Sequence, residues 1–201
     1  LTVDELHQLM ANMDSPAQKE IFLVEDLLQL SQLDTGVIPP ATQCPRIEVP
    51  ALLKSITRDA AQISAGKHQI EVEIDPTVKI LGIEKEIYSV FSNLLNNAVR
   101  YTPEGSTIRV VWKSTPEGAL FQVIDNEVGI APEYIDRLTE RFFRIDVGRS
   151  RDSGGTGLGL SIVKQVLRRH DSELSIESEL GKGSTFSCLF LNERVERKSV
   201  L

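Results

Sequence analysis

The chain has 201 residues, of which 41% are hydrophobic and 25% are charged, and its formal net charge is −7 at pH 7. Such a chain suits one ordinary domain with an extra element, or two small domains. An acidic chain is a poor candidate for binding nucleic acid or an anionic membrane surface. No apolar run approaches the ~20 residues of a transmembrane helix, and no signal peptide opens the sequence.

The two cysteines, Cys44 and Cys188, do not have the spacing of metal ligands. We expect free thiols in a reducing compartment. The chain begins at Leu1 instead of Met, which favours a fragment of a longer protein. We therefore expect a cytoplasmic polypeptide, and any membrane anchor of the parent protein would lie outside this chain.

Residues 1–36 contain two helical patterns. The first spans about 3–13, and the second begins at Ser15 and Pro16, which suit the N-cap and the first helical position. The second pattern carries an apolar stripe made of Ile21, Val24, Leu27 and Leu28. No neighbour within this segment can bury the stripe, so we expect a helical hairpin that pairs with a second copy of the chain. Packing against the rest of this chain is the alternative.

A linker is predicted next, because residues 36–50 hold four prolines and no hydrophobic periodicity. We place the linker proper at 37–45 and the start of a catalytic domain at 46. That domain, 46–191, alternates helices and strands before a charged tail at 192–201 that we expect to be frayed. The predicted helices are 51–65, 84–106, a short piece near 132–138 and the segment up to Arg169; the predicted strands are 70–74, 78–81, 107–113, 119–125, 173–177 and 184–191. Mostly antiparallel strands with three long helices on one face predict an α+β fold, a two-layer sandwich.

The stretch 84–106 predicts a helix with two different faces. Its apolar face consists of Ile87, Phe91, Leu94, Leu95 and Ala98. Its other face carries Asn93, Asn97, Arg100 and Tyr101, which the helical period places on one stripe. A helix that only packs in a core has no need of two amides, a cation and a phenol in line, so the stripe predicts a binding site.

The glycine-rich segment 154–159 leads directly into a helix. Glycines allow a close approach of the backbone, and a helix N-terminus offers free N–H groups to phosphate. The segment lacks the strand–helix–strand context of a dinucleotide fold and the Lys-Ser or Lys-Thr of a P-loop. A flexible loop without a ligand is the alternative.

Three distant segments predict the same ligand, a Mg²⁺–adenine nucleotide. Asn97 offers an amide oxygen, which suits a Mg²⁺ that keeps most of its waters and binds phosphate oxygens. Arg100 can reach a phosphate, and Tyr101 can stack on or hydrogen-bond a nucleotide. Asp125 ends a strand before Gly129, where a carboxylate can accept a hydrogen bond from an adenine amino group.

Four motifs now resemble those of one family. NLLNNAVRYTPEG (93–105), DNEVGI (125–130), RFFR (141–144) and GGTGLGLSIVK (154–164) resemble the N, G1, F and G2 boxes of sensor histidine kinases, in the same order. LTERFFRID and ESELGKGSTF are similar to the phosphate-regulon sensor type. The resemblance covers about residues 46–190 and implies the Bergerat ATP-binding fold, which gyrase-type ATPases and Hsp90 share.

The resemblance also implies roles for single residues. Asn97 would hold Mg²⁺ with Asn93 near it, Arg100 and Arg144 would meet phosphate, and Tyr101 and Asp125 would lie at the adenine. The further cofactor-binding positions are Gly129, Ile130, Gly155, Thr156, Gly157, Leu158 and Gly159, the glycine-rich ones under a lid at 139–156. No residue is assigned as catalytic, because the phosphoacceptor histidine is absent.

Residues 24–34 resemble the end of the second helix of the dimerisation and histidine-phosphotransfer hairpin, and residues 1–3 resemble the residues just after the family's H box. The H box itself is missing, since His7, His68 and His170 lack its context. We therefore expect only a partial hairpin, and no autophosphorylation by this chain alone.

The G1 box departs from the family at Glu127, where the family has glycine. A non-glycine residue forced to positive φ costs roughly 1–2 kcal/mol, whereas at negative φ the cost is small. We expect ATP binding to be weakened but not abolished.

Hydrolytic relatives of this fold carry a glutamate at the place of Asn93, and an amide cannot accept a proton from water at neutral pH. This favours phosphoryl transfer over hydrolysis. The resemblance thus implies the catalytic part of a two-component histidine kinase, which passes the γ-phosphoryl group of ATP to a histidine and then to a response-regulator aspartate. The alternative is a non-catalytic nucleotide sensor or dimerising scaffold.

Overall fold

The structure is a computed structural model that describes residues 16–35, 40–145 and 155–197. The predicted helix at 3–13 and part of the predicted lid lie outside these residues. The helices are α2 (Pro16–Thr35), η1 (Ala41–Gln43), α3 (Val49–Ser64), α4 (Glu84–Tyr101), α5 (Pro132–Ile135), α7 (Gly159–Arg169) and η2 (Asn192–Arg194). The strands are β1 (Arg46–Ile47), β2 (Gln69–Ile74), β3 (Val78–Leu81), β4 (Thr107–Ser114), β5 (Gly118–Asp125), β6 (Ser172–Glu179), β7 (Gly183–Leu191) and β8 (Val195–Arg197).

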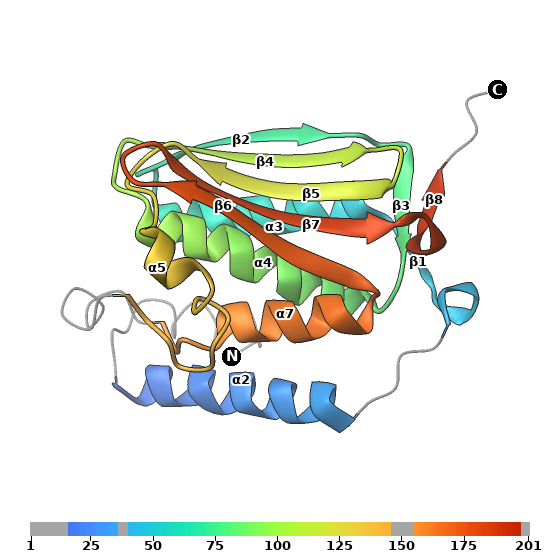
Figure 1. The fold of residues 1–201 in the computed structure, drawn as a ribbon, viewed down its shortest axis with the longest axis horizontal. Helices are drawn as coiled ribbons and strands as arrows, with labels where there is room; N and C mark the ends of the chain where they lie inside the picture. The colour runs from blue at the N-terminus through green and yellow to red at the C-terminus, as the bar shows by residue number, and fades with distance from the viewer. Residues whose placement is uncertain (1–15, 36–39, 146–154, 198–201) are drawn as a thin grey trace, which may run out of the picture.

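A five-stranded sheet and three long helices form two layers, which confirms the predicted α+β sandwich (Figure 1). The strand order is β2-β4-β5-β7-β6. The pairs β4–β5, β5–β7 and β6–β7 are antiparallel, as expected, while the edge strand β2 runs parallel to β4. Helices α3, α4 and α7 cover one face of the sheet, so this face carries the core (Figure 1).

The core forms where the apolar stripe of α4 meets the inward side chains of the central strands. Phe91 is fully buried, and its ring stacks on Phe121 with 3.9 Å between the ring centroids. Trp112 and Phe190 complete this aromatic cluster. Burial of one such side chain contributes about 1.5–3 kcal/mol. Packing of the apolar face therefore fixes the orientation of α4, and its polar stripe points away from the core.

Residues 192–197 form η2 and β8, so the prediction of a frayed tail was wrong for these residues. Strand β8 pairs with β3, which pairs in turn with β1, and these three strands form a small second sheet. Arg194 is buried and donates a hydrogen bond to Asp171 Oδ2 over 3.0 Å. The folded chain brings Arg194 to the carboxylate of Asp171, which is 23 residues away in the sequence. This pairing could not be predicted from the neighbours of Arg194 in the sequence.

Helix α2 packs against α7 and reaches α4 through Gln29 and Ser89, but not through the apolar stripe for which packing on this chain was the predicted alternative. Leu30 and Leu33 are buried in the same core as the helices of the sandwich. The predicted stripe lies on the other side and is exposed: Ile21, Val24, Leu27 and Leu28. Helix α2 thus has two apolar faces, one packed on this chain and one exposed.

Among the helices of residues 16–35, 40–145 and 155–197, none combines the length and the hydropathy of a membrane-spanning segment.

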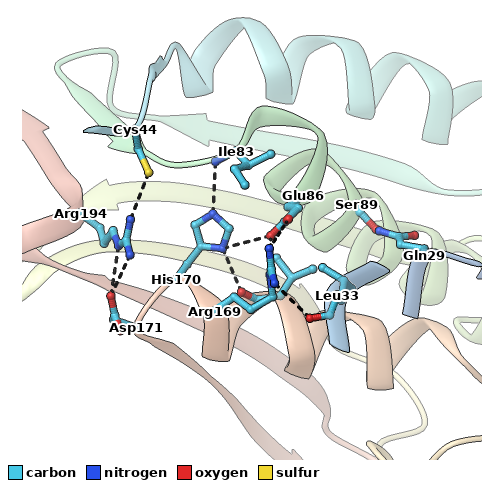
Figure 2. A network of polar contacts seen from close by, with 11 residues as sticks. Gln29, Leu33, Cys44, Ile83, Glu86, Ser89, Arg169, His170, Asp171 and Arg194 are labelled. Carbon is cyan, nitrogen blue, oxygen red and sulfur yellow. Dashed lines mark hydrogen bonds and ion pairs between the residues drawn. The ribbon is translucent and has the colours of Figure 1, made fainter. Parts of the chain in front are cut away.

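His170 is fully buried at the end of α7 (Figure 2). The N–H of Ile83 donates to its Nε2 over 3.3 Å, so Nδ1 carries the proton and donates to Val166 O over 2.9 Å. Burial lowers the pKa of His170, although Glu86 at 3.8 Å acts in the opposite direction. The positive charges of Arg194 and Arg169 lower it further.

We expect the folded chain to lose stability as the pH falls below about 6.5, the ordinary pKa of histidine. Below this pH the His170 side chain of the unfolded chain binds a proton, whereas the folded chain, in which its pKa is lowered, does not. The stability that neutral His170 contributes is therefore complete above about pH 6.5 and is lost as the pH falls below it. Urea unfolding between pH 8 and pH 5 measures the effect. The slope with pH should be smaller in His170→Gln, and an equal slope in both proteins would contradict the assignment.

Candidate nucleotide-binding site

Three residues of the polar stripe of α4, Asn93, Arg100 and Tyr101, lie close to the glycine-rich segment. A Cβ atom placed on Gly155 would lie 2.9 Å from Arg100 Nη1 and 3.4 Å from the Tyr101 hydroxyl. One placed on Gly159 would lie 2.5 Å from Asn93 Oδ1. The absence of side chains at these two glycines therefore lets the backbone approach the stripe closely. The structure brings together two motifs that are far apart in sequence.

The orientation of the Asn93 amide is fixed by its own helix. Its Nδ2 donates to Ser89 O over 2.8 Å and to Ser89 Oγ over 3.3 Å. Its oxygen is therefore turned toward Gly159 at the start of α7. Asn97 follows one helical turn later and is half-buried. The helix thus holds two side-chain amides one turn apart, and the Asn93 oxygen is directed at the start of α7.

The start of α7 offers a hydroxyl group and backbone N–H groups. Leu158 N donates to Thr156 Oγ1 over 3.2 Å, and Leu158 itself is buried. The Thr156 hydroxyl donates in turn to Asp26 Oδ2 of α2 over 2.6 Å. A helix N-terminus with a nearby arginine, here Arg100, is a favourable environment for phosphate.

Residues of the F box join the glycine-rich segment. Arg144 Nη1 donates to Gly155 O over 2.5 Å, and Phe142 N donates to Gly157 O over 2.9 Å. Both Phe142 and Gly157 have positive φ, +65° and +75°. A Cβ at Gly157 would lie 2.9 Å from Phe142 Cα, so glycine is required for this contact. Arg144 thus lies beside the candidate phosphate-binding backbone.

The G1 segment follows β5. Asp125 is half-buried, and its Oδ1 accepts a hydrogen bond from Glu127 N over 3.2 Å. Burial raises the pKa of Asp125, hydrogen bonds from Glu127 and Ser184 oppose the shift, and the charge of Glu127 adds to it. Gly129 has a φ of +67°, and a Cβ there would lie 2.1 Å from Glu179 O. Ile130 N donates to Ser178 Oγ over 2.7 Å.

Glu127 is not among the described non-glycine residues with positive φ, which are Ala65, Phe142 and Asp171. The backbone cost considered for Glu127 is therefore absent. What Glu127 brings to the G1 segment is its negative charge beside Asp125.

The donor set fits Mg²⁺ better than a soft metal. Among the described residues, no three His, Cys, Asp or Glu side chains are grouped as metal ligands. Asn93 and Asn97 offer amide oxygens, and a Mg²⁺ ion commonly takes its remaining ligands from water and substrate phosphate. Cys44 and Cys188 are buried and form no disulfide with each other, and neither is among the residues of the site.

Three site residues escaped the sequence analysis: Asp26, Gln29 and Ser89. The first two lie on α2, and Gln29 Nε2 donates to Ser89 Oγ over 2.8 Å (Figure 2). No sequence motif marks Asp26 or Gln29 as part of a nucleotide site, because their contacts with it depend on how α2 packs. Ser89 could have been found from the sequence, since it lies one helical turn before Asn93.

The sequence matches the histidine kinase-, DNA gyrase B- and HSP90-like ATPase family over residues 82–194. The phosphate regulon sensor protein PhoR of Pseudomonas aeruginosa is 46% identical over 181 residues, which are 88% of this chain and 40% of that protein. PhoR of Haemophilus influenzae is 42% identical over 142 residues, 71% of this chain and 33% of that protein. The chain therefore spans at most 40% of the length of these two relatives.

Solved structures share the fold. The mycobacterial sensor histidine kinase MprB superposes with a TM-score of 0.65 at 23% identity, over 74% of this chain and 97% of that one. Full-length ShkA in complex with AMPPNP gives a TM-score of 0.76 at 23% identity, over 90% of this chain and 38% of that one. The family match includes α4, α7 and the central strands. The chain therefore belongs to the histidine kinase-, DNA gyrase B- and HSP90-like ATPase family, and ATP is the ligand that this membership implies.

Proposed function

We propose that this chain is the ATP-binding catalytic part of a two-component sensor histidine kinase. It transfers the γ-phosphoryl group of ATP to a histidine outside this chain, from which a response-regulator aspartate receives it. The observation that carries the proposal is the contact of Asn93, Arg100 and Tyr101 with the glycine-rich start of α7. The similarity to the two PhoR proteins supports it.

In this proposal the α4 stripe and the glycine-rich segment share the polyphosphate. Asn97 would hold Mg²⁺ with Asn93 near it, and the bound ion would supply positive charge to the phosphates. Arg100 and Arg144 contact phosphate oxygens, as does the backbone of the α7 start: Gly155, Thr156, Gly157, Leu158 and Gly159. Tyr101 and the G1 residues Asp125, Gly129 and Ile130 lie at the adenine end.

The chemistry favours transfer over hydrolysis. The accepting imidazole nitrogen attacks the γ-phosphorus, its bond to phosphorus forms, and the bond to the β,γ-bridging oxygen breaks as ADP leaves. Asn93 is a neutral amide and cannot deprotonate a water. Positioning and charge neutralisation by Arg100 and Arg144 carry most of the catalysis, because the nitrogen is already nucleophilic.

The domain division is part of the proposal. Residues 1–36 are a partial dimerisation and phosphotransfer hairpin, 37–45 a linker, and 46–197 the catalytic domain, extended from 191 because β8 pairs with β3. The exposed apolar residues of α2, such as Val24 and Leu28, form the homodimer contact. The chain acts in the cytoplasm, with any membrane anchor elsewhere in the parent protein.

The experiment supplies labelled ATP and Mg²⁺ to this chain together with a separate dimerisation hairpin that carries an H-box histidine. Transfer of label to the hairpin supports the kinase. The label should be lost in acid, because a phosphorus–nitrogen bond is acid-labile. A hairpin with His→Gln at the acceptor is the matched control and should stay unlabelled. ATP binding without any transfer would instead indicate a nucleotide-sensing scaffold.

Removal of the Glu127 charge should strengthen ATP binding. We expect Glu127→Gln to lower the dissociation constant about two- to fivefold, because a negative charge near an anionic ligand is removed. Glu127→Gly should give the same change, since no positive φ is relieved. Isothermal titration with ATP compares the three proteins. A gain in the glycine variant alone would show that the backbone, not the charge, limits binding.

A further inference from the structure

Helix α2 lies next to the residues proposed to bind phosphate, and it contacts both the start of α7 and helix α4. Asp26 accepts the Thr156 hydroxyl bond over 2.6 Å, and three residues later Gln29 donates to Ser89 over 2.8 Å. At the end of the helix, Leu33 O accepts from Arg169 Nη1 over 3.0 Å (Figure 2). These contacts accompany the burial of Leu30 and Leu33, so α2 is docked by apolar and polar contacts together.

Asp26 occupies the surroundings that suit a phosphate. Its carboxylate bonds to Thr156, whose Oγ1 also receives the N–H of Leu158 at the start of α7. Burial raises the pKa of Asp26, and the Thr156 hydrogen bond and the charge of Arg100 act against that shift. The positive charge of Arg100 therefore favours the ionised form of the carboxylate. The Thr156 hydroxyl, the charge of Arg100 and the N-terminus of α7 all favour one negative group at this place, which is the Asp26 carboxylate. A phosphate at the same place would be repelled by that carboxylate.

The other contact reaches the metal side of the site. Gln29 Nε2 donates to Ser89 Oγ, which also receives a hydrogen bond from Asn93 Nδ2. The amide of Asn93 is thus connected to α2 through one hydroxyl group. Docking of α2 therefore reaches both the residue next to the proposed Mg²⁺ and the residues next to the proposed phosphates.

We propose that docked α2 holds the nucleotide site in a state of low affinity, because the Asp26 carboxylate competes with ATP phosphate for Thr156 and Arg100. The proposal rests on the proposed function, which assigns these residues to phosphate. Docking of α2 and binding of ATP then oppose each other. Because such coupling is reciprocal, ATP loosens α2 to the same degree that docked α2 weakens ATP binding.

The first test is ATP titration of the full chain and of Asp26→Asn. Asparagine retains an oxygen that can accept the Thr156 bond, so the variant removes charge and little else. We expect the dissociation constant for ATP to fall about five- to tenfold. Glu20→Gln is the control, because Glu20 is an exposed acid on the same helix and its removal changes net charge equally. This control should bind ATP like the parent.

The second test loosens α2 away from the phosphates. Leu30→Ala removes buried apolar contacts of α2 and should lower the dissociation constant for ATP about fivefold, although Leu30 is not among the proposed nucleotide contacts. Hydrogen exchange supplies the reciprocal readout, since saturating ATP should speed exchange of the α2 amides in the parent chain. Circular dichroism verifies that the variants are folded.

The outcomes separate the two proposals. Stronger ATP binding in Asp26→Asn and Leu30→Ala, with faster α2 exchange, supports the inference. Equal affinity of the parent and both variants overturns it and leaves the proposed ATP site intact. Slower α2 exchange with ATP also overturns it, because docking and binding would then cooperate. Failure of the parent and every variant to bind ATP overturns both proposals.

Discussion

Replacement of Gly157 by alanine should weaken ATP binding by about tenfold or more. Gly157 has a φ of +75°, and its new Cβ would lie 2.9 Å from Phe142 Cα and 3.0 Å from Phe142 C. These are backbone atoms and cannot turn aside as a flexible side chain can. The hydrogen bond from Phe142 N to Gly157 O holds the two segments together at this point. The alanine must separate the F box from the glycine-rich segment and so displace Arg144, which bonds to Gly155 O.

Gly66→Ala is the matched control for this variant. Gly66 has a φ of +79°, and a Cβ there would meet nothing within 4 Å. It imposes the same backbone strain, about 1–2 kcal/mol, at a position after α3. We expect a small loss of stability in both variants and a loss of ATP affinity only in Gly157→Ala. If titration shows equal affinity losses, strain in general and not the contact with Phe142 explains the effect.

Replacement of Arg169 by methionine should lower the free energy of unfolding by about 3–5 kcal/mol. Arg169 binds both oxygens of Glu86, through Nε over 3.2 Å and Nη2 over 3.1 Å, and both side chains are largely buried (Figure 2). Without Arg169 the Glu86 carboxylate lacks this partner in a poorly solvated place. The carbonyl of Leu33 at the end of α2 loses its hydrogen bond as well.

Two further proteins make this prediction specific. The Arg169→Met, Glu86→Leu double variant also removes the Glu86 carboxylate, so no unpaired buried charge remains. Urea unfolding should therefore show that the double variant is more stable than Arg169→Met alone. The control is Arg109→Met, whose ion pair with Glu73 is about half exposed on both sides, 53% and 58%. Solvent screens that pair, and we expect a loss of about 0–1 kcal/mol. A loss of this size in Arg169→Met would contradict a buried, energetically important pair.

The main elements of the sandwich could be predicted because their signals are local. The apolar stripe of α4 repeats at the helical period, and the turn at 115–118 separates two strands that pair as predicted. The same period places Asn93 and Arg100 on one face, and glycine spacing marks the start of α7. Backbone geometry and side-chain periodicity act over a few residues, so a single sequence records them.

Other features depend on contacts that local patterns do not contain. The charged residues of the tail suggested fraying, but Arg194 is buried against Asp171 because two distant segments meet. The cost of Glu127 depends on its φ, which the sequence left open and the structure shows is not positive. Charge and backbone conformation at such positions follow from the surrounding fold.

The sequence by itself determined the family and the two-layer fold, because the order of the motifs and the amphipathic period can be read along the chain. Only the tertiary structure decided which face of α2 is packed. Leu30 and Leu33 turn inward while Val24 and Leu28 stay exposed, and this brings Asp26 to Thr156. The physical reason is that a helix with two apolar faces has two possible partners, and the choice depends on the complementary surface that α4 and α7 build.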